Sequence, residues 1–296
     1  MDWGVALAGL GVGFVVGLTG MGGGALMTPI LVLLFGVDPL TAVSSDLVAS
    51  LVMKPFGASV HARRGTVNMD LVRWLCLGSV PSAFAGVLVL KALGGENLQD
   101  DVKLLLGAAL LLAAVSMVIR QAIQRRRALD VPVDGAQHLI AVRPLPTVAI
   151  GVIGGFIVGM TSVGSGSLMI VMLLLLYPTL AAAQLVGTDL VQAIPLVGAA
   201  ALGHILFGDF QFGLTGALLV GAIPGVYFGA RVSSRAPDRV IRPILVAVLV
   251  ISGAKLLGAP DDVVLAMTGA GVAAAVVVGG LALRRRSLEP AASSVS

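Results

Sequence analysis

Charged residues and cysteine are both scarce in this chain. Asp, Glu, Lys and Arg make up 11% of its 296 residues, whereas a typical soluble domain has about 25%. Hydrophobic residues make up 57% of the chain, and its mean hydropathy is +1.04. So few charges cannot cover a soluble globule, and the composition predicts an all-α polytopic membrane protein. The net charge of +4 does not indicate nucleic-acid binding, because the basic residues cluster in loops between apolar runs.

The single cysteine, Cys76, excludes an intramolecular disulfide and any metal or iron–sulfur site built from several cysteines. It lies in an apolar run, where packing is its expected role. The chain also has no HExxH, Walker loop or GxSxG pattern and no paired carboxylates at a usable spacing. Its glycine string GMGGG lacks the strand before it and the acidic residue after it that dinucleotide binding requires. We therefore expect neither an enzyme nor a bound metal or cofactor.

Apolar runs, by contrast, are abundant, and a full bilayer crossing takes about 20 apolar residues. The candidate spans in the first half are residues 3–19, 23–36, 41–62, 68–92 and 101–120. Those in the second half are residues 146–160, 165–177, 182–206, 211–231 and 240–257, with an unpaired span at 262–283. The amino terminus has no basic region and no small-residue cleavage site, so we expect the first run to be retained.

Two of these runs, 23–36 and 165–177, are too short to cross the bilayer comfortably. We expect each to form a broken or re-entrant hairpin with the helix before it, which gives roughly 8 to 11 membrane segments in total.

The two halves of the chain repeat each other. The stretch GLTGMGGGALM (17–27) returns as GMTSVGSGSLM (159–169), and residues 13–27 agree with residues 155–169 at nine of fifteen positions. Five segments per repeat would turn the second copy over relative to the first. The sequence therefore predicts two inverted-topology repeats, an architecture common among secondary transporters.

Loop charges agree with this count. The basic clusters are Arg63 and Arg64; Arg120, Arg125 to Arg127 and Arg143; Arg231, Arg235, Arg239 and Arg242; and Arg284 to Arg286. The remaining loops, residues 94–101, 207–211 and 258–262, are acidic or neutral. Because basic loops stay inside, we expect the linker between the halves and the carboxyl terminus to face the cytoplasm of a multi-pass inner-membrane protein.

The chain then divides into five parts. These are a first transmembrane repeat at 1–120, a basic cytoplasmic linker at 121–145, a second and inverted repeat at 146–257, an extra carboxyl-terminal transmembrane helix at 258–286 and a disordered tail at 287–296. The linker is polar and contains Pro132, Pro144 and Pro146.

Each glycine stretch separates two apolar runs and is a candidate binding site, because bare backbone at membrane depth is costly unless a cavity or ligand meets it. Short helices starting near Gly24 and Gly166 would direct free amides and positive dipole ends at the motifs, which suits a small oxyanion. The residues expected to bind substrate are Thr19, Gly20, Gly22, Gly23, Gly24, Thr161, Ser162, Gly164, Ser165 and Gly166. The alternative is that these glycines only allow close helix packing. Packing is our interpretation of the repeated Gly78, Gly86, Gly221 and Gly229.

Five ionisable residues are candidates for coupling or for bracing the site. Asp46 and Asp189 match at an offset of 143 residues, and each could cap a helix start, relay a proton or cation, or brace the glycine loop. Lys54 could pair with Asp46, attract an anion or extend to the membrane edge. His61 and His204 also match and fall at helix ends, where capping or an interfacial position is the default.

The chain resembles the TauE/SafE sulfite exporter family, also called the four-toluene-sulfonate uptake permeases. The resemblance covers about residues 4–257 and rests on GLTGMGGG followed by Thr28 and Pro29, and on HARRGTVN, LGSVPSAFAG, VGTDLVQAIPLVGAAALGH and GAIPGVYFGARVS. It implies an inner-membrane permease for sulfite, thiosulfate, sulfonates or related anions, coupled to an ion gradient. Because SVGSGS replaces GMGGG in the second motif and SSD replaces GTD in the first half, the half-sites need not be equivalent.

We therefore expect a secondary transporter that moves a small sulfur-containing anion by alternating access, with a coupling proton or cation as a further partner. The alternatives are a permease for another small anion or carboxylate and a non-transporting membrane assembly subunit. The expected site is geometric: the two motifs should approach each other, with Asp46 and Asp189 close behind them.

Overall fold

The computed structural model describes residues 2–19, 23–95, 97–130, 141–232 and 238–269. Within these ranges every regular element is a helix, so the predicted all-α class is confirmed. The helices are α1 (Trp3–Thr19), α2 (Gly24–Phe35), α3 (Pro39–Arg63), α4 (Met69–Leu93), α5 (Leu98–Asp130), α6 (Pro144–Thr161), α7 (Leu168–Leu176), α8 (Ala182–Phe207), α9 (Phe212–Val232) and α10 (Asp238–Leu256). Residues 261–269 form one further helical stretch.

The helix bounds follow the apolar runs closely, with two differences. Helix α5 continues to Asp130, ten residues beyond the predicted end of the first repeat at residue 120, and Pro144 and Pro146 belong to the first turn of α6. Proline is tolerated in a first helical turn because its missing N–H would have no intrahelical partner there. The predicted eleventh span and the tail lie largely outside the described residues, as do residues 131–140 of the linker.

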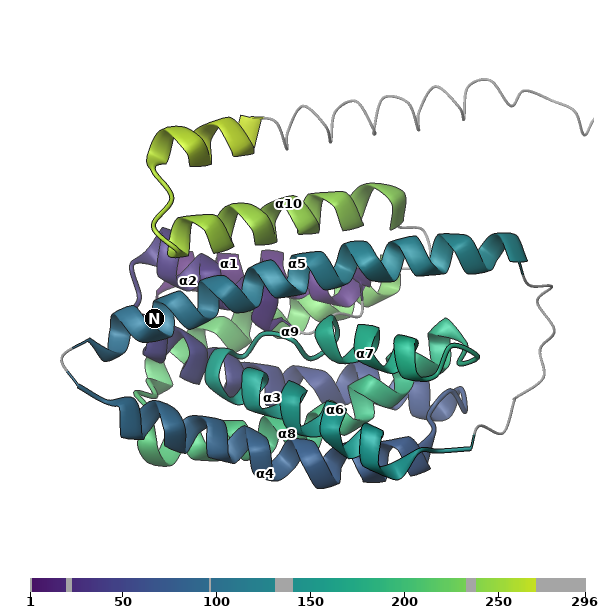
Figure 1. Ribbon diagram of the computed structural model, residues 1–296. Helices are drawn as coiled ribbons and strands as arrows, with labels where there is room; N and C mark the ends of the chain where they lie inside the picture. The colour runs from purple at the N-terminus through teal and green to yellow at the C-terminus, as the bar shows by residue number, and fades with distance from the viewer. Residues whose placement is uncertain (1, 20–22, 96, 131–140, 233–237, 270–296) are drawn as a thin grey trace, which may run out of the picture.

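The short helices α2 and α7 turn back beside the helices that precede them. Gly4 at the start of α1 lies against Phe35 at the end of α2. In the second half, the Tyr177 hydroxyl after α7 accepts a hydrogen bond of 2.8 Å from the Arg143 amide and lies 2.6 Å from Thr147 Oγ1 in α6. Figure 1 shows that these two hairpins open toward opposite ends of the molecule.

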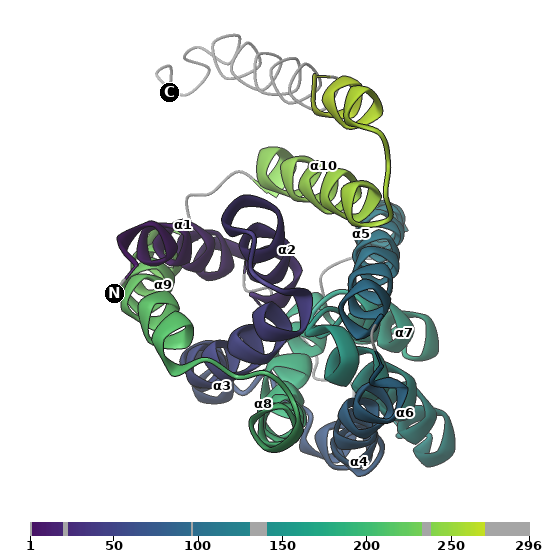
Figure 2. The same ribbon diagram turned by 90° about the vertical axis from the view of Figure 1, so that its left-hand side faces the viewer.

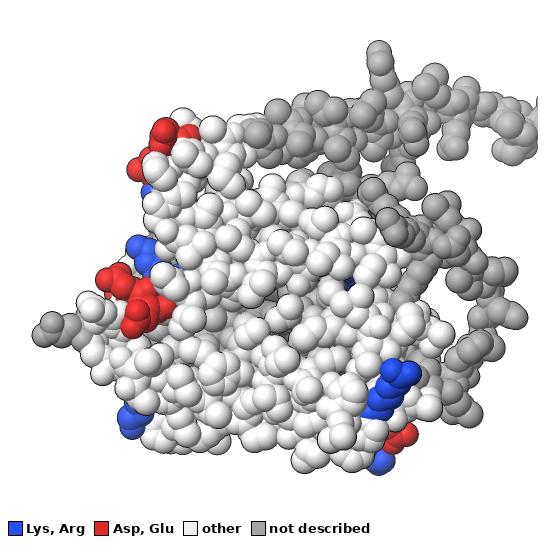
Figure 3. All heavy atoms as spheres, viewed as in Figure 1, with Lys and Arg blue, Asp and Glu red and all other residues white. Residues whose placement is uncertain are grey.

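The two ends of the helix bundle differ in charge. One end, here called the acidic end, collects the starts of α3, α5 and α9 and the end of α8, and there Thr41 Oγ1 donates a 2.7 Å hydrogen bond to Asp209. The other, the basic end, collects the end of α3 and the starts of α4, α6 and α8, with Arg63, Arg64 and Arg143. Figure 3 shows the charged side chains of one face gathered at these two ends, with a largely uncharged belt between them.

Glycine stripes hold two pairs of helices in close contact. Helix α1 packs against α9 and helix α6 against α4, and α3 and α8 lie between these pairs (Figure 2). A side chain on Gly13 of α1 would collide with the Ala222 carbonyl of α9, and one on Gly155 of α6 would collide with the Ser79 carbonyl of α4. The packing interpretation of Gly78, Gly86, Gly221 and Gly229 also agrees with the structure, since a side chain on each would meet backbone of the facing helix.

The dimensions of the fold suit a bilayer. Five described helices are long and apolar enough to cross it, namely α4, α5, α6, α8 and α9, and α1 and α2 are shorter apolar helices. The exact number of spans and the inverted repeat stay predictions. The exchange of partners between the halves agrees with the repeat, because α1 pairs with α9 as its counterpart α6 pairs with α4.

Candidate functional site

The two glycine motifs meet inside the bundle. Gly24 at the start of α2 lies so close to Ser162 that a side chain on Gly24 would collide with the Ser162 carbonyl. Gly20 and Gly22 of the first motif lie outside the described residues, whereas Gly23 and Gly24 are buried. The geometry expected from the sequence, in which the two motifs approach each other, is therefore present for the part of the first motif that is described.

The glycines of the motifs have two different roles. Gly164 and Gly166 have φ angles of 119° and 93°, a region open to glycine but strained for residues with a Cβ. Ser162 has a φ of 59° and ends α6 in a left-handed conformation. Gly159, by contrast, is helical and packs against the Ala83 backbone of α4. The glycines after Thr161 thus form the bend, and those before it form the helix interface.

Asp46 joins the second motif to the start of α2. It is fully buried, and its carboxylate accepts hydrogen bonds from Ser162 Oγ at 2.6 Å, Thr28 Oγ1 at 3.1 Å and Ser50 Oγ at 3.5 Å. The hypothesis that Asp46 caps a helix start is wrong, because α3 begins seven residues earlier at Pro39. Of the alternatives from the sequence, these bonds agree with the brace.

Asp189 is placed in the same way but has different partners. It is also inside its helix, α8, so capping is wrong here as well. Gln192 Nε2 donates to Asp189 Oδ1 at 3.2 Å, and Ser79 Oγ donates to Gln192 Oε1 at 3.3 Å. The backbone of Gly166 also hydrogen-bonds to Asp189, which connects this carboxylate to the second motif. The two aspartates are therefore not equivalent in their contacts.

Lys54 lies between the two aspartates and the second motif. Its side chain is buried, and Nζ donates a 3.0 Å hydrogen bond to Ser165 Oγ. It also interacts electrostatically with both Asp46 and Asp189. Because the Lys54 ammonium group contacts the second motif, it does not extend to the membrane edge, and that alternative is wrong.

The two matched histidines have different surroundings. His204 is fully buried, with Nε2 2.8 Å from the Gly159 carbonyl and Nδ1 2.8 Å from Ser44 Oγ. It therefore binds a carbonyl in the last turn of α6, one of the groups that lack an intrahelical partner. His61 is half-buried, and its Nδ1 lies 2.9 Å from Thr66 Oγ1 in the next loop.

A large cavity of about 1020 Å³ leads from the first motif toward the basic end. It lies between α3, α9 and the end of α1. Its cationic side chains are Lys54, Arg64 and Arg231, and its described lining contains no Asp or Glu. Arg231 stacks on the Tyr227 ring at 4.5 Å, which holds one of these charges in the wall of the cavity.

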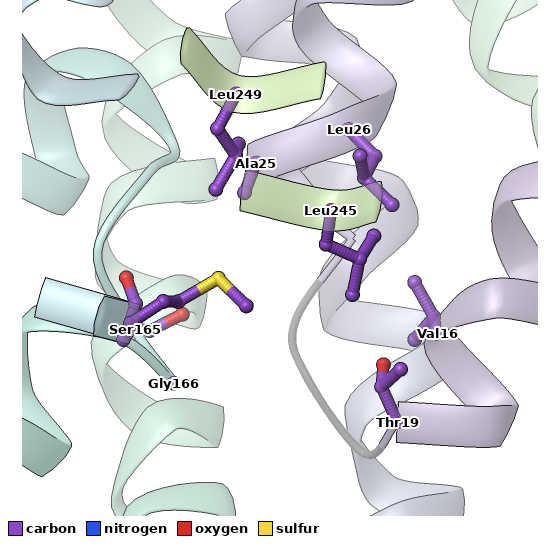
Figure 4. A pocket seen from close by; sticks show the side chains of 10 residues that line it. Val16, Thr19, Ala25, Leu26, Ser165, Gly166, Leu245 and Leu249 are labelled. Atoms are coloured by element: carbon purple, nitrogen blue, oxygen red, sulfur yellow. The ribbon is translucent and has the colours of Figure 1, made fainter. Parts of the chain in front are cut away.

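A second, smaller cavity lies between Thr19 of the first motif and Ser165 and Gly166 of the second, beside the place where the motifs meet. Thr19 lines both cavities. Figure 4 shows Thr19 on one side of it and Ser165 and Gly166 on the other, with Leu245 and Leu249 of α10 covering it. Thr161 is not among the lining residues, since its hydroxyl bonds the Ile157 carbonyl at 2.7 Å.

The expected set of free helix amides is only partly present. The amides of Leu26 and Met27 donate to the Gly23 carbonyl, and those of Leu168 and Met169 donate to the Gly164 carbonyl. Helix α7 begins at Leu168, two residues later than expected, so its first amides are used inside the motif. Positive charge at the candidate site therefore comes from side-chain cations more than from helix ends.

Several site residues were missed from the sequence. Thr28 and Gln192 contact the aspartates, and Arg64, Tyr227 and Arg231 line the large cavity. Gln192 lies three residues after Asp189, a helical spacing that could have suggested the contact. The sequence shows Arg64 and Arg231 only as loop charges. Because they are more than 160 residues apart in the sequence, it does not reveal that both line one cavity.

Comparison with known proteins agrees with the geometry. The family model "Sulfite exporter TauE/SafE" matches residues 5–256. The chain belongs to this TauE/SafE family. It is 39% identical over 263 residues to the "Probable membrane transporter protein YjnA" of Bacillus subtilis (strain 168), covering 87% of this chain and 100% of the relative. It is 26% identical over 251 residues to YdhB of the same organism, similarly named, covering 83% and 96%. No solved structure matches the chain.

The family and the named relatives indicate that this TauE/SafE protein is a multi-pass membrane transporter, with a small-molecule substrate and a lipid environment.

Proposed function

We propose that the protein is a secondary transporter that moves a small sulfur-containing anion, such as sulfite, thiosulfate or an organosulfonate, across the inner membrane by alternating access. Lys54 carries this proposal. It is the charged group at which the large cavity, the second motif and both buried aspartates meet. An ammonium group in a low-dielectric site attracts an oxyanion far more strongly than one in water.

The route to Lys54 also favours an anion. Arg64 and Arg231 lie in the same cavity as Lys54, and the described lining contains no Asp or Glu. Asp46 and Asp189 are buried outside this lining, where Lys54 interacts with both. Such one-signed cavities concentrate counter-ions and speed their entry. The hydroxyls of Thr19 and Ser50 line the same cavity, but each already donates within the protein, Thr19 to the Val15 carbonyl at 2.8 Å and Ser50 to Asp46 at 3.5 Å. The positive charge of Lys54 is therefore the main attraction for an anion.

The second candidate is a permease for a small carboxylate or another anion, since the same cations would attract it.

For either substrate, a proton or cation would couple through Asp46 or Asp189, which are ionisable groups buried beside Lys54.

The test is uptake and counterflow by the purified protein in proteoliposomes, against sulfite, thiosulfate, sulfate, an arylsulfonate and small carboxylates. We expect flux of at least one reduced-sulfur or sulfonate anion above protein-free vesicles, and competition among the anions that are carried. Flux of carboxylates alone would support the second candidate. A panel in which nothing moves, with the protein folded and oriented in the vesicles, would overturn both.

A further inference from the structure

The two repeat-related helix pairs stand differently against the central helices α3 and α8. The pair α4 and α6 packs directly on α8: a side chain on Gly203 of α8 would lie 2.9 Å from Val87 of α4, and Phe84 meets Phe207 edge to face at 6.1 Å. The pair α1 and α9 instead leaves the large cavity between itself and α3. One half of the transporter is therefore closed and the other is open.

In the closed half, His204 is the polar contact that α8 makes with the helical part of α6, before the bend of the second motif. Its Nε2 must donate to Gly159, because a carbonyl can only accept. Gly159 belongs to the same tight interface with Ala83 that holds α6 to α4. His204 thus joins α6 of this pair to the central helix α8 at a site with no exposed surface, in addition to the hydrogen bond from Ser79 of α4 to Gln192 of α8.

The open half contains the counterparts of both partners. His61 is the repeat position of His204, at an offset of 143 residues, and Gly17 is that of Gly159, at an offset of 142. His61 and Gly17 both line the large cavity, one on α3 and the other on α1. Gly17 also belongs to a tight helix interface, since a side chain there would lie 2.7 Å from the Ala230 amide of α9.

We propose that His61 and His204 are alternating latches: His204 holds the α4–α6 pair closed through the Gly159 carbonyl in this state, and His61 holds the α1–α9 pair closed through the Gly17 carbonyl in the opposite state. The proposal rests on the alternating access proposed above and adds the residues that position each state. Neither histidine is assigned a contact with the substrate. Closing the open half moves α1 toward α3, brings Gly17 to His61 and removes the cavity, while release of Gly159 by His204 opens the acidic end.

The proposal predicts opposite effects for substitutions of His204 and His61. The accessibility of introduced cysteines measures these effects without a transport assay. In a Cys76→Ser background, Ser59→Cys reports the large cavity, which Ser59 lines. Ala200→Cys reports the closed half, because Ala200 is fully buried and is the repeat counterpart of Gly57 in the cavity wall. The rate of maleimide labelling is measured for each reporter in proteoliposomes.

His204→Leu is expected to slow labelling of Ser59→Cys about fivefold, the shift produced by about 1 kcal/mol, and to speed labelling of Ala200→Cys. His61→Leu is expected to change both rates in the opposite direction. His204→Gln and His61→Gln keep an amide donor and serve as conservative controls with rates near those of the parent. Equal shifts from the two leucine variants, or none, would overturn the proposal.

Misfolding and failure of the proposed function are separable from these outcomes. Should His204→Leu not give monodisperse protein, the His61→Leu arm still decides, because it must raise exposure of the large cavity. Anion flux is measured in the same vesicles. Opposite labelling shifts without flux of any anion leave the latch standing and remove the proposed substrate, whereas flux without labelling shifts removes the latch alone.

Discussion

At the scale of single residues, substitution of Lys54 is the most direct test of substrate recognition. Lys54→Met keeps the length of the side chain and removes its charge. A hydrogen bond to a charged group contributes about 1.5–3 kcal/mol, so we predict that KM for the transported anion rises roughly ten- to a hundredfold. Lys54→Arg should retain part of the affinity. The measurement is concentration-dependent uptake in proteoliposomes.

Lys91→Met is the matched control, because Lys91 is exposed and lies over the Phe207 ring, away from the large cavity. It should leave KM unchanged. Since Lys54 also offsets the charge of Asp46 and Asp189, the melting temperature of each variant is measured alongside. An unchanged KM in a folded Lys54→Met protein would show that the anion binds elsewhere.

The residues of this site were predictable as a list but not as a set of contacts. An aspartate and a lysine inside apolar runs stand out in any sequence, because burying a charge is costly. The hydrogen bond between Ser162 and Asp46 could not be predicted from the sequence, because 116 residues separate them. The cap interpretation failed for a local reason: α3 starts at Pro39, and no feature of Ser44 or Ser45 marks them as interior residues.

At the scale of elements, the glycine stripes set how closely the helices approach. Helix α1 offers a matched pair two residues apart. A side chain on Gly13 would lie 2.8 Å from the Ala222 Cα of α9, whereas the same position on Gly11 has no neighbour within 4 Å. We predict that Gly13→Ala destabilises the protein by about 1–3 kcal/mol through overpacking. Gly11→Ala should stabilise it by about 0.5–1 kcal/mol through helix propensity.

Thermal unfolding in detergent compares the two variants under one condition. Equal melting temperatures would mean that α1 and α9 are not in backbone contact in solution.

The helices themselves were predictable, because apolar runs and their interruptions are local features. Their pairing was not, because α1 and α9 lie at opposite ends of the sequence and a glycine does not reveal which helix it faces.

At the scale of the whole molecule, the charge difference between the two ends predicts the orientation. Lys and Arg in short loops stay in the cytoplasm, so the basic end with Arg63, Arg64 and Arg143 should face inward. In a Cys76→Ser background, Gly95→Cys reports the acidic end and Ala62→Cys the basic end, and both positions are exposed. An impermeant maleimide should label Gly95→Cys in intact cells and Ala62→Cys only after permeabilisation.

The same measurement decides which compartment the large cavity faces, because Arg64 and Arg231 at its wall belong to the basic end. With the predicted orientation, the state described here is open to the cytoplasm and an anion reaches Lys54 from inside. The closed half, with His204 on Gly159, then separates Lys54 from the outside. Labelling of Ala62→Cys in intact cells would reverse both statements, since the cavity would then load from outside.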